Sequence, residues 1–472
     1  MIYPHMKRSG AKNVSSGAAS KKLAALMKHV LADVTPSKEE EASLRFAANE
    51  VMGRLVHAAP KYVEIMLAGS AARGTQVSGS SDIDIFLLFP RKMDEKAIEE
   101  SGLKIGKSIV NKGKGESYMV KYAEHPYVRL LLNDIGLKVD VVPAYKISNA
   151  TERGTAVDRT QLHNEFINSH LSQRQRGDVR LLKAFLKAHR IYGAEAKIEG
   201  FSGYLCELLI YHYGSFPKLL EAFSGMSLPV AINHGVKSPD ANAEVKRFGK
   251  EFIVVDPTDS NRNVAANVSQ ESLLRLVFSS RKLLADQSLE SFYGKPFSSV
   301  NSSARLAAES SALGTMYTIH FRIPDMAPDI IWQQLKRLRT RLHSSLEDYG
   351  FIVTASIQNA SDSDALMSFF IQNDRLLSRV INGPSLGMAD AATKFASAHS
   401  KSISLYADEG RIKAIEKPEH PTPESFLRAF LKSKKADLPS HLSARSAMVH
   451  VGKLPEEQAK LLYEEYYNRF SL

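Results

Sequence analysis

The sequence predicts a multidomain α+β protein, and three observations support this class. The chain has 472 residues, which at roughly 100–200 residues per domain corresponds to about three or four domains. Its hydrophobic fraction of 44% and charged fraction of 24% are ordinary for a globular protein and exclude wholesale disorder. Short apolar segments of strand length occur together with longer segments of helical periodicity, both early and late in the chain.

The N-terminal part is expected to comprise a mobile arm, residues 1–24, and an α+β head, residues 25–154. The arm is rich in Ser, Gly and Lys and lacks the apolar segment of a signal peptide. A helix is predicted to begin at Thr35 and Pro36, because proline is tolerated in a first turn and the three glutamates that follow favour the positive end of the helix dipole. This helix ends before Pro60.

Three strands are predicted within the head. They cover residues 62–67, 82–89 and 128–142, and the last contains a turn near Asn133 and ends at Pro143, since proline cannot donate to a sheet. Strands surrounded by helices can bury a shared apolar core, so these strands and the helix before them are expected to form one compact domain.

A helical and basic segment is predicted from Thr155 to about Tyr213. An apolar stripe at helical spacing runs through its middle. Six cations lie around this stripe between Arg174 and Arg190, with Asp178 as the single acid among them. Such a run is usually a solvated helix face, and contact with the phosphates of a nucleic acid is the alternative.

Two further regions are expected after this segment. A loop-rich section at 256–267 precedes another helix. A Ser- and Ala-rich segment at 302–311 marks a boundary. Beyond it the order strand, helix, strand, strand predicts a small independent α+β domain.

Charge and cysteine content narrow the partners and the compartment. The chain carries 62 Lys and Arg against 51 Asp and Glu, a net charge of +11, which favours a polyanionic partner. The single cysteine, Cys206, cannot form an intrachain disulfide and lies in an apolar run, which indicates a reducing compartment and a cytoplasmic location. No segment approaches the ~18 consecutive apolar residues of a membrane span, so no membrane partner is expected.

Two aspartates in an apolar strand are the most informative residues about chemistry. Asp82 and Asp84 are two positions apart, so both point to the same face of the strand. Carboxylates on one face repel each other unless a cation neutralises them, and this strand has no basic residue. If the strand of Asp140 is a neighbour, the three acids could hold two Mg²⁺ ions about 4 Å apart. A solvent-facing pair at a sheet edge is the alternative, which the apolar flanks disfavour.

A segment of small residues before this strand is expected to supply an anion site. Gly69 permits a tight turn, so that the helix after it can direct free N–H groups at a phosphate. Ser70 can add a hydroxyl donor and Arg73, one turn later, a charge-assisted contact to a triphosphate. The sequence GxxxxGK[ST] is absent, which disfavours NTP hydrolysis of the P-loop type.

Together these motifs resemble those of the nucleotidyltransferase superfamily that includes DNA polymerase β. The chain is further similar to the archaeal-type (class I) CCA-adding enzymes, the tRNA nucleotidyltransferases, from about residue 25 to its C-terminus and most closely between about 60 and 290. The segments that carry this similarity are YAEHPYV (122–128), VDVVPAY (139–145), AVDRTQLHNEF (156–166), VRLLKAFLKAHRIYGAE (179–195), GFSGYLCELLIYHYGSF (200–216) and VVDPTDSNRNVAANVS (254–269). The family commonly has Glu where this chain has Asp82, a change that keeps the ligand type and shortens its reach.

The resemblance implies a fold, a cofactor and a set of site residues. The fold would be a polymerase β-like head, a helical neck at residues 155–245, an α+β body at residues 246–311 that residues 416–472 complete, and an α+β tail at residues 312–415 that grips the tRNA. Asp82, Asp84 and Asp140 would be catalytic and would hold Mg²⁺ in a two-metal site. The residues implied to bind the nucleotide are Ser70, Arg73, Thr160, His163, Lys183, Tyr192 and Arg262, the last by hydrogen bonds to the base. Without the resemblance, His163, Lys183 and Tyr192 would be interpreted as polar residues on a helix surface.

The activity implied is template-independent addition and repair of the 3′-terminal CCA of tRNA from CTP and ATP, with release of pyrophosphate. The expected partners are the acceptor stem and elbow of tRNA, ATP and CTP. Another RNA nucleotidyltransferase of the superfamily, such as a poly(A) polymerase or an oligoadenylate synthase, is one alternative, against which the neck and the motif around Arg262 argue. A noncatalytic RNA-binding protein is the other, against which the intact acids argue. The sequence leaves the oligomeric state open, a homodimer included.

Overall fold

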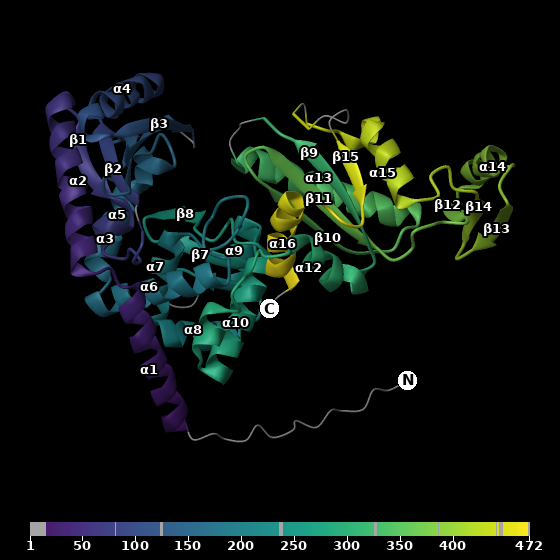
Figure 1. Cartoon of the computed structure of the whole chain (residues 1–472), viewed down its shortest axis with the longest axis horizontal. Coiled ribbons are helices and arrows are strands. Elements are labelled where there is room, and N and C mark those ends of the chain that lie inside the picture. The colour runs from purple at the N-terminus through teal and green to yellow at the C-terminus, as the bar shows by residue number, and fades with distance from the viewer. Residues whose placement is uncertain are drawn as a thin grey trace. The chain divides into compact units, whose positions relative to one another are not determined.

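The computed structural model describes residues 16–80, 82–122, 126–235, 239–324, 328–385, 387–439, 441–442 and 447–470. The chain divides into two compact units, Met1–Lys295 and Pro296–Leu472, termed the first and the second unit. Both units combine helices with sheets, which confirms the predicted multidomain α+β class (Figure 1). Within the described residues, no helix is both long enough and apolar enough to span a membrane.

A five-stranded mixed sheet forms the centre of the head, with the strand order β1-β2-β5-β4-β3. Its strands are β1 (Glu64–Ala68), β2 (Asp82–Phe89), β3 (Ser117–Tyr122), β4 (Pro126–Leu132) and β5 (Leu137–Tyr145). The strand of the two aspartates, β2, pairs with β1 in antiparallel and with β5 in parallel orientation. It therefore lies inside the sheet, and the alternative that placed the aspartates at a sheet edge is wrong.

Strand β5 continues through Pro143, where the sequence predicted an end. Strand β4 pairs with β5 only as far as Val141, so Pro143 lies where β5 has a partner strand on its β2 side alone. A residue without an N–H is accommodated where one side of the strand has no partner to bond. The extra length matters for the site, because it carries the chain directly from Asp140 toward the start of the neck.

Helices α2 (Lys38–Ala58) and α4 (Glu95–Ser108) cover one face of the head sheet (Figure 1). The residues of β2 that alternate with the aspartates point into the core beneath these helices. Helix α2 begins after Ser37, slightly later than predicted, because Ser37 and Glu40 form a capping box in which each side chain accepts a hydrogen bond from the other residue's backbone N–H. A five-residue helix, α3 (Gly69–Arg73), follows β1.

A further helix, α1 (Ser16–Val34), precedes α2. The prediction of a mobile arm is therefore wrong for residues 16–24, while the remainder of that arm, residues 1–15, lies outside the described residues. Leu23 and Val30 are buried in the core of the neck. Their burial explains why the segment is ordered as a helix although its start is polar and small in composition.

The remainder of the first unit is mainly helical. Its helices are α5 (Thr160–His170), α6 (Gln173–Ala188), α7 (Gly203–Tyr213), α8 (Phe216–Ser224), α9 (Ala241–Phe248), α10 (Gln270–Asp286) and α11 (Leu289–Tyr293). They enclose a three-stranded sheet of β6 (Val230–Ile232), β7 (Phe252–Asp256) and β8 (Asp259–Asn263). The loop-rich interpretation of residues 256–267 is wrong for its first half, which forms the turn and the second strand of a β7–β8 hairpin.

Two arginines of α6 bond to backbone carbonyl groups of the head. Arg180 is buried and donates from Nε to the carbonyl of Gln76 and from Nη2 to the carbonyl of Gly74, both at 2.9 Å. Arg176 donates to the carbonyl of Arg73. The interpretation of this run as a solvated face is wrong for these residues, because they bind the carbonyl groups at the end of α3 and so hold that helix against the neck.

The second unit contains a four-stranded antiparallel sheet with helices on both faces. The strands, in the order β10-β11-β9-β15, are β9 (Thr315–Arg322), β10 (Val353–Ala360), β11 (Asp364–Ile371) and β15 (Met448–Val451). Helices α13 (Pro328–Tyr349) and α15 (Pro423–Lys432) share a core with one face, and α12 (Ser302–Ser310) and α16 (Glu456–Phe470) share a core with the other. A separate small sheet, β12 (Arg379–Ser385), β14 (Arg411–Glu416) and β13 (Ser404–Asp408), carries α14 (Ala389–Ala398) (Figure 1).

This arrangement corrects two predicted boundaries. The Ser- and Ala-rich segment is helix α12, and the division between units falls at residues 295 and 296. The segment 312–415 is not an independent tail, because its strands β9 to β11 share a sheet with β15 from the segment 416–472. The predicted body is likewise divided between the two units. Sequence reasoning missed this because the pairing of β15 with β9 joins residues far apart in the chain.

Candidate active site

The three predicted carboxylates lie on two adjacent strands of the head. Asp84 of β2 stands opposite Asp140 of β5 in the parallel register, and Asp82 lies two residues before Asp84 on the same face. Burial raises the pKa of Asp84 to about 6, and the negative charges of Asp140 and Asp82 add to this rise, whereas Arg73 opposes it. An added cation near these acids would therefore favour the ionised form of Asp84.

Asp140 has a partner that the sequence reasoning missed. Arg129 of β4 stands opposite Asp140 in the antiparallel register and donates from Nε and Nη2 to its two carboxylate oxygens, each at 2.6 Å. In the part of the chain that the structure describes, no three Asp, Glu, His or Cys side chains form a ready-made metal site. The sequence does carry a signal for this pair: Arg129 is the single cation of one apolar strand, and Asp140 is the single acid of the next.

Gly69 brings the chain into close contact with Asp84. Its φ of +67° lies in the left-handed region, and a Cβ atom built there would lie 1.9 Å from Oδ2 of Asp84. The turn after β1 therefore needs glycine for both conformation and space. This contact places the start of α3 directly beside the carboxylates, as the order of the motifs suggested.

If the carboxylates catalyse the nucleotidyl transfer that the resemblance implies, Gly69→Ala is expected to reduce its rate by at least about a hundredfold, because the added methyl group must displace Asp84 or the turn. The measurement is the steady-state rate of that reaction, alongside a circular dichroism melt to verify folding. Gly79→Ala is the matched control, because Gly79 also has a positive φ of +74° but a Cβ there meets no atom within 4 Å. Equal losses of activity in the two variants would contradict a steric role at Asp84.

A buried charge network joins α3 to the neck. Arg73 is buried, and its Nε lies 2.9 Å from a carboxylate oxygen of Glu207 on α7, which is 0% exposed. Lys183 of α6 is also buried, with Nζ 3.9 Å from Glu207 and 3.1 Å from the carbonyl of Thr75. Burial lowers the pKa of Lys183, and the charge of Glu207 opposes that change. Glu207 thus compensates two cations that the sequence reasoning assigned to the nucleotide.

The remaining predicted nucleotide residues on this side lie around the same network. Ser70 is the half-buried second residue of α3. Tyr192 is half-buried, and a Cβ atom built on Gly203 at the start of α7 would lie 3.2 Å from its hydroxyl and 3.6 Å from Nζ of Lys183. The polar ends of Tyr192 and Lys183 therefore lie close together beside the first turn of α7. Their contacts with a triphosphate stay predictions.

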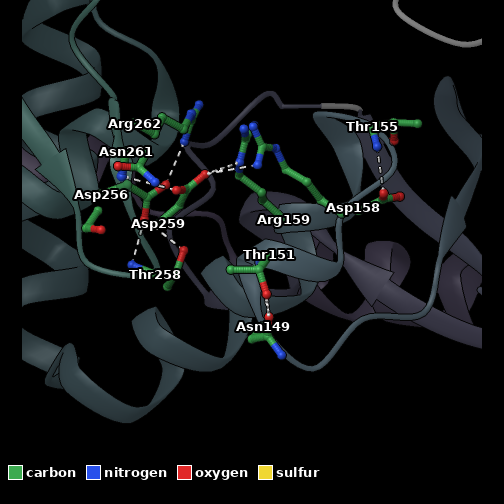
Figure 2. Close-up of polar contacts among 12 residues, drawn as sticks. Asn149, Thr151, Thr155, Asp158, Arg159, Asp256, Thr258, Asp259, Asn261 and Arg262 are labelled. Atoms are coloured by element: carbon green, nitrogen blue, oxygen red, sulfur yellow. Dashed lines mark hydrogen bonds and ion pairs between the residues drawn. The ribbon is translucent and has the colours of Figure 1, made fainter. Parts of the chain in front are cut away.

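His163 and Arg262 meet at a second buried acid, Asp256 of β7. The Nε2 atom of His163 lies 3.0 Å from Asp256, and its ring stacks on Tyr204 with 3.8 Å between the ring centroids. Arg262 of β8 donates from Nη1 to Asp256 at 2.8 Å (Figure 2). Thr160, half-buried, is the first residue of α5, one turn before His163. The structure thus brings His163 and Arg262 together although 99 residues separate them in sequence.

Three family models match this chain along its length. The nucleotidyltransferase domain matches residues 49–163, the second domain of tRNA nucleotidyltransferase matches residues 177–293, and the C-terminal domain of the CCA-adding enzyme matches residues 314–448. These matches cover the head, the neck with the β7–β8 hairpin, and most of the second unit.

Curated relatives show the same relationship. The CCA-adding enzyme of Archaeoglobus fulgidus is 36% identical over 412 residues, which are 87% of this chain and 90% of that protein. The CCA-adding enzyme of Methanocaldococcus jannaschii is 38% identical over 351 residues, 72% of this chain and 75% of that protein. A solved structure of the Cid1 poly(U) polymerase covers 58% of this chain and 99% of its own, with a TM-score of 0.47 and 15% identity. On the identity and coverage of these curated relatives, the chain belongs to the family of CCA-adding enzymes.

Proposed function

We propose that this protein adds and repairs the 3′-terminal CCA of tRNA without a nucleic-acid template, with CTP and ATP as its nucleotide substrates. The observation that carries this function is the match to CCA-adding enzymes over 87% of the chain. The buried, unpaired Cys206 agrees with a cytoplasmic location. The site residues support the proposal because the three acids, the buried cations and Arg262 all lie in the first unit.

Asp82, Asp84 and Asp140 are proposed to hold Mg²⁺, whose preference for carboxylate oxygens matches this donor set. When bound, two such ions would lower the pKa of the tRNA 3′-hydroxyl and neutralise charge on the triphosphate. The raised pKa of Asp84 supports this fit, because three acids on one sheet face need a positive charge to ionise together. Arg129 supplies part of that charge at Asp140 and keeps its carboxylate oriented.

The proposed reaction is attack of the tRNA 3′-hydroxyl on the α-phosphorus of the nucleotide, with pyrophosphate as the leaving group. Ser70 and Arg73 are proposed to contact the triphosphate from α3, and Lys183 and Tyr192 from the neck. Their role is to hold the α-phosphorus in line with the attacking oxygen and to offset negative charge. No covalent intermediate on the protein is needed.

Base selection is proposed to lie at Arg262, with Thr160 and His163 lining the pocket. Arg262 keeps 33% of its side chain exposed while its Nη1 is held by Asp256. Its other N–H groups are donors, and they suit the acceptors O2 and N3 of cytosine and N1 of adenine. Uracil carries a donor at N3, which an arginine donor in the same place would oppose.

The small sheet β12-β14-β13 is proposed to contact the body of the tRNA, far from the 3′ end. Exposed cations here are Lys394 on α14 and Arg411 on β14, together with Lys401 and Lys417 in the segments beside the strands. The excision of residues 378–418 is geometrically simple, because Leu376 N–H donates to the carbonyl of Pro421 at 2.8 Å, so the two ends lie side by side. A short Gly/Ser linker can therefore close the gap.

Replacement of residues 378–418 by this linker is expected to weaken binding of whole tRNA about tenfold and to make its salt dependence shallower, because phosphate contacts are lost. Extension of a stem-only substrate that ends before the elbow should change little. The measurement is filter binding over a salt series. The full chain with the four exposed cations changed to Gln is the matched variant, and it should show the same change in slope. An unchanged affinity in both would contradict the tRNA contact.

The test of the function itself is incubation with tRNA that lacks its last three nucleotides, together with labelled CTP and ATP. We expect two CMP residues followed by one AMP. Addition of AMP alone, in long tracts, would instead identify a poly(A) polymerase. No incorporation with any RNA acceptor would support a noncatalytic RNA-binding protein.

A further inference from the structure

Two buried aspartates, Asp256 and Asp259, stand at the two ends of the turn between β7 and β8 (Figure 2). Asp256 bonds to His163 of α5, and Asp259 bonds to Arg159, the residue before α5. Asp256 ends β7 and is 1% exposed, and Asp259 begins β8 and is 7% exposed. Buried carboxylates are costly unless they are paired and hydrogen-bonded. Each of the two aspartates beside Arg262 therefore needs partners that compensate its burial.

Asp256 is fully engaged by four side chains. Its Oδ2 accepts from Nε2 of His163 at 3.0 Å and from Nη1 of Arg262 at 2.8 Å. Its Oδ1 accepts from the hydroxyl of Tyr204 at 3.1 Å and from the hydroxyl of Thr258 at 2.8 Å. Although burial opposes ionisation, the bonds from His163, Thr258 and Arg262 hold the pKa of Asp256 well below its usual range.

The same contact fixes the state of His163. Burial lowers the pKa of His163, although the contact with Asp256 opposes this change. The lowered pKa favours the neutral ring near pH 7. A neutral ring that donates from Nε2 to Asp256 has an unprotonated Nδ1. Asp256 therefore sets the orientation of the arginine and the tautomer of the histidine with one carboxylate oxygen.

Asp259 holds the turn and does not hold Arg262. Its carboxylate accepts from Nε of Arg159 at 2.9 Å, and Arg153 lies 3.9 Å away (Figure 2). Arg159 is four residues before His163, so both side chains lie on one side of the helical segment. The two aspartates are three residues apart in the hairpin, and each contacts one of these side chains. Among the residues that the structure describes, Asp259 makes no hydrogen bond to Arg262 or His163.

The connector before α5 links this turn to the strand of Asp140. Asp158, beside Arg159, is 0% exposed and accepts from the backbone N–H groups of Tyr145 at 2.8 Å and Thr155 at 2.9 Å. Tyr145 is the last residue of β5. A continuous set of bonds therefore runs from the strand that bears Asp140, through Asp158 and Arg159, to the hairpin that bears Arg262.

We propose that Asp256 is a positioning residue for nucleotide selection, which rests on the proposed function. It holds Nη1 of Arg262 so that the remaining N–H groups present one fixed donor pattern to the nucleobase. A fixed pattern opposes the N3–H donor of uracil, whereas a free guanidinium can turn away from it. Asp259 and Asp158 fix the hairpin, and Asp256 fixes the arginine upon it.

The test compares Asp256→Asn with Asp259→Asn, the same substitution in the same turn. We expect Asp256→Asn to raise KM for CTP and to lower CTP-over-UTP discrimination by about tenfold or more, with kcat at saturating CTP within about threefold of wild type. Asp259→Asn should leave discrimination within about threefold. Tyr204→Phe keeps the ring stacked on His163 and removes one bond to Asp256, so a smaller loss in the same direction is expected.

Several outcomes would overturn the positioning role. Equal losses of discrimination in Asp256→Asn and Asp259→Asn would show that the carboxylates only stabilise the turn. Unchanged discrimination in both Asp256→Asn and Tyr204→Phe would exclude any effect on Arg262. If the wild-type protein adds no CMP to tRNA that lacks CCA, the proposed function fails. In that case the affinity for CTP, measured by calorimetry, decides the positioning role separately. An affinity about tenfold weaker in Asp256→Asn than in Asp259→Asn would support the role, and equal affinities would contradict it.

Discussion

Asp84→Ala is expected to lower the turnover of nucleotidyl transfer by at least about a thousandfold while the protein remains folded. Asp84 lies between Asp82 on its own strand and Asp140 on the next, so it is the acid best placed to share a metal ligand role with both. Its loss would remove a ligand and the negative charge on which the proposed metal sites depend. The measurement is single-turnover CMP addition at saturating CTP and tRNA.

The same residue predicts a pH-dependent change in stability. The folded-state pKa of Asp84 is raised from 3.8 to about 6, so the ionised form is less favourable in the folded than in the unfolded chain. In metal-free protein this contribution to stability is present below about pH 4 and is lost as the pH rises through about 6. Asp84→Asn should avoid that loss and raise the free energy of unfolding above pH 7, by at most about 3 kcal/mol.

Asp82→Asn separates the effect on stability from the effect on turnover. Asp82 is exposed, so its neutralisation should change the free energy of unfolding little while it still lowers turnover. Urea unfolding in the presence of a chelator at pH 5 and pH 8 gives the stability comparison. Turnover of Asp84→Ala within about tenfold of wild type would contradict the catalytic assignment, whatever the stability result.

Glu207→Ala is expected to lower the free energy of unfolding by about 3–5 kcal/mol. Glu207 is the carboxylate that compensates Arg73 and Lys183, and its removal would leave two buried cations with no acid between them. The affinity for every nucleotide should fall together, since α3 and α6 lose their common partner. Thermal and urea unfolding, with equilibrium binding of CTP and ATP, are the measurements.

A second substitution separates charge from cavity effects at Glu207. Adding Lys183→Met to Glu207→Ala should restore part of the lost stability, because one uncompensated cation is removed. The buried Thr75 hydroxyl also loses its acceptor in Glu207→Ala, which sets a limit to that recovery. A double variant no more stable than Glu207→Ala, or a single variant within about 1 kcal/mol of wild type, would contradict the compensating role.

The parts of the site that the sequence predicted are those set by local spacing. Asp82 and Asp84 share a face because strand residues alternate, and Gly69 precedes them at a fixed distance in the chain. The apolar strand β5 around Asp140 was also evident. That β2 and β5 are neighbours could be inferred only from the resemblance or from the structure, because hydrophobic periodicity does not determine the order of strands in a sheet.

The parts that the sequence did not predict depend on long-range partners. Arg73 and Glu207 are 134 residues apart and Arg159 and Asp259 are 100 apart, so no local pattern links them. Strand β8, DSNRN, has no apolar residue and is a strand only because the apolar strand β7 pairs with it. The resemblance supplied His163 and Arg262, and the buried carboxylate between them emerged only from the packing of the hairpin on α5.

One measurement tests the function most directly: sequencing of the 3′ ends formed on three acceptors, tRNA that lacks CCA, tRNA that ends in C and tRNA that ends in CC. With all four NTPs present, we predict that the first two acceptors gain only the missing C residues followed by A, and that the third gains a single A. Asp84→Asn should form none of these products. Correct CCA ends from Asp84→Asn, or UMP and GMP in the ends formed by wild type, would contradict the proposed chemistry and its selection of nucleotides.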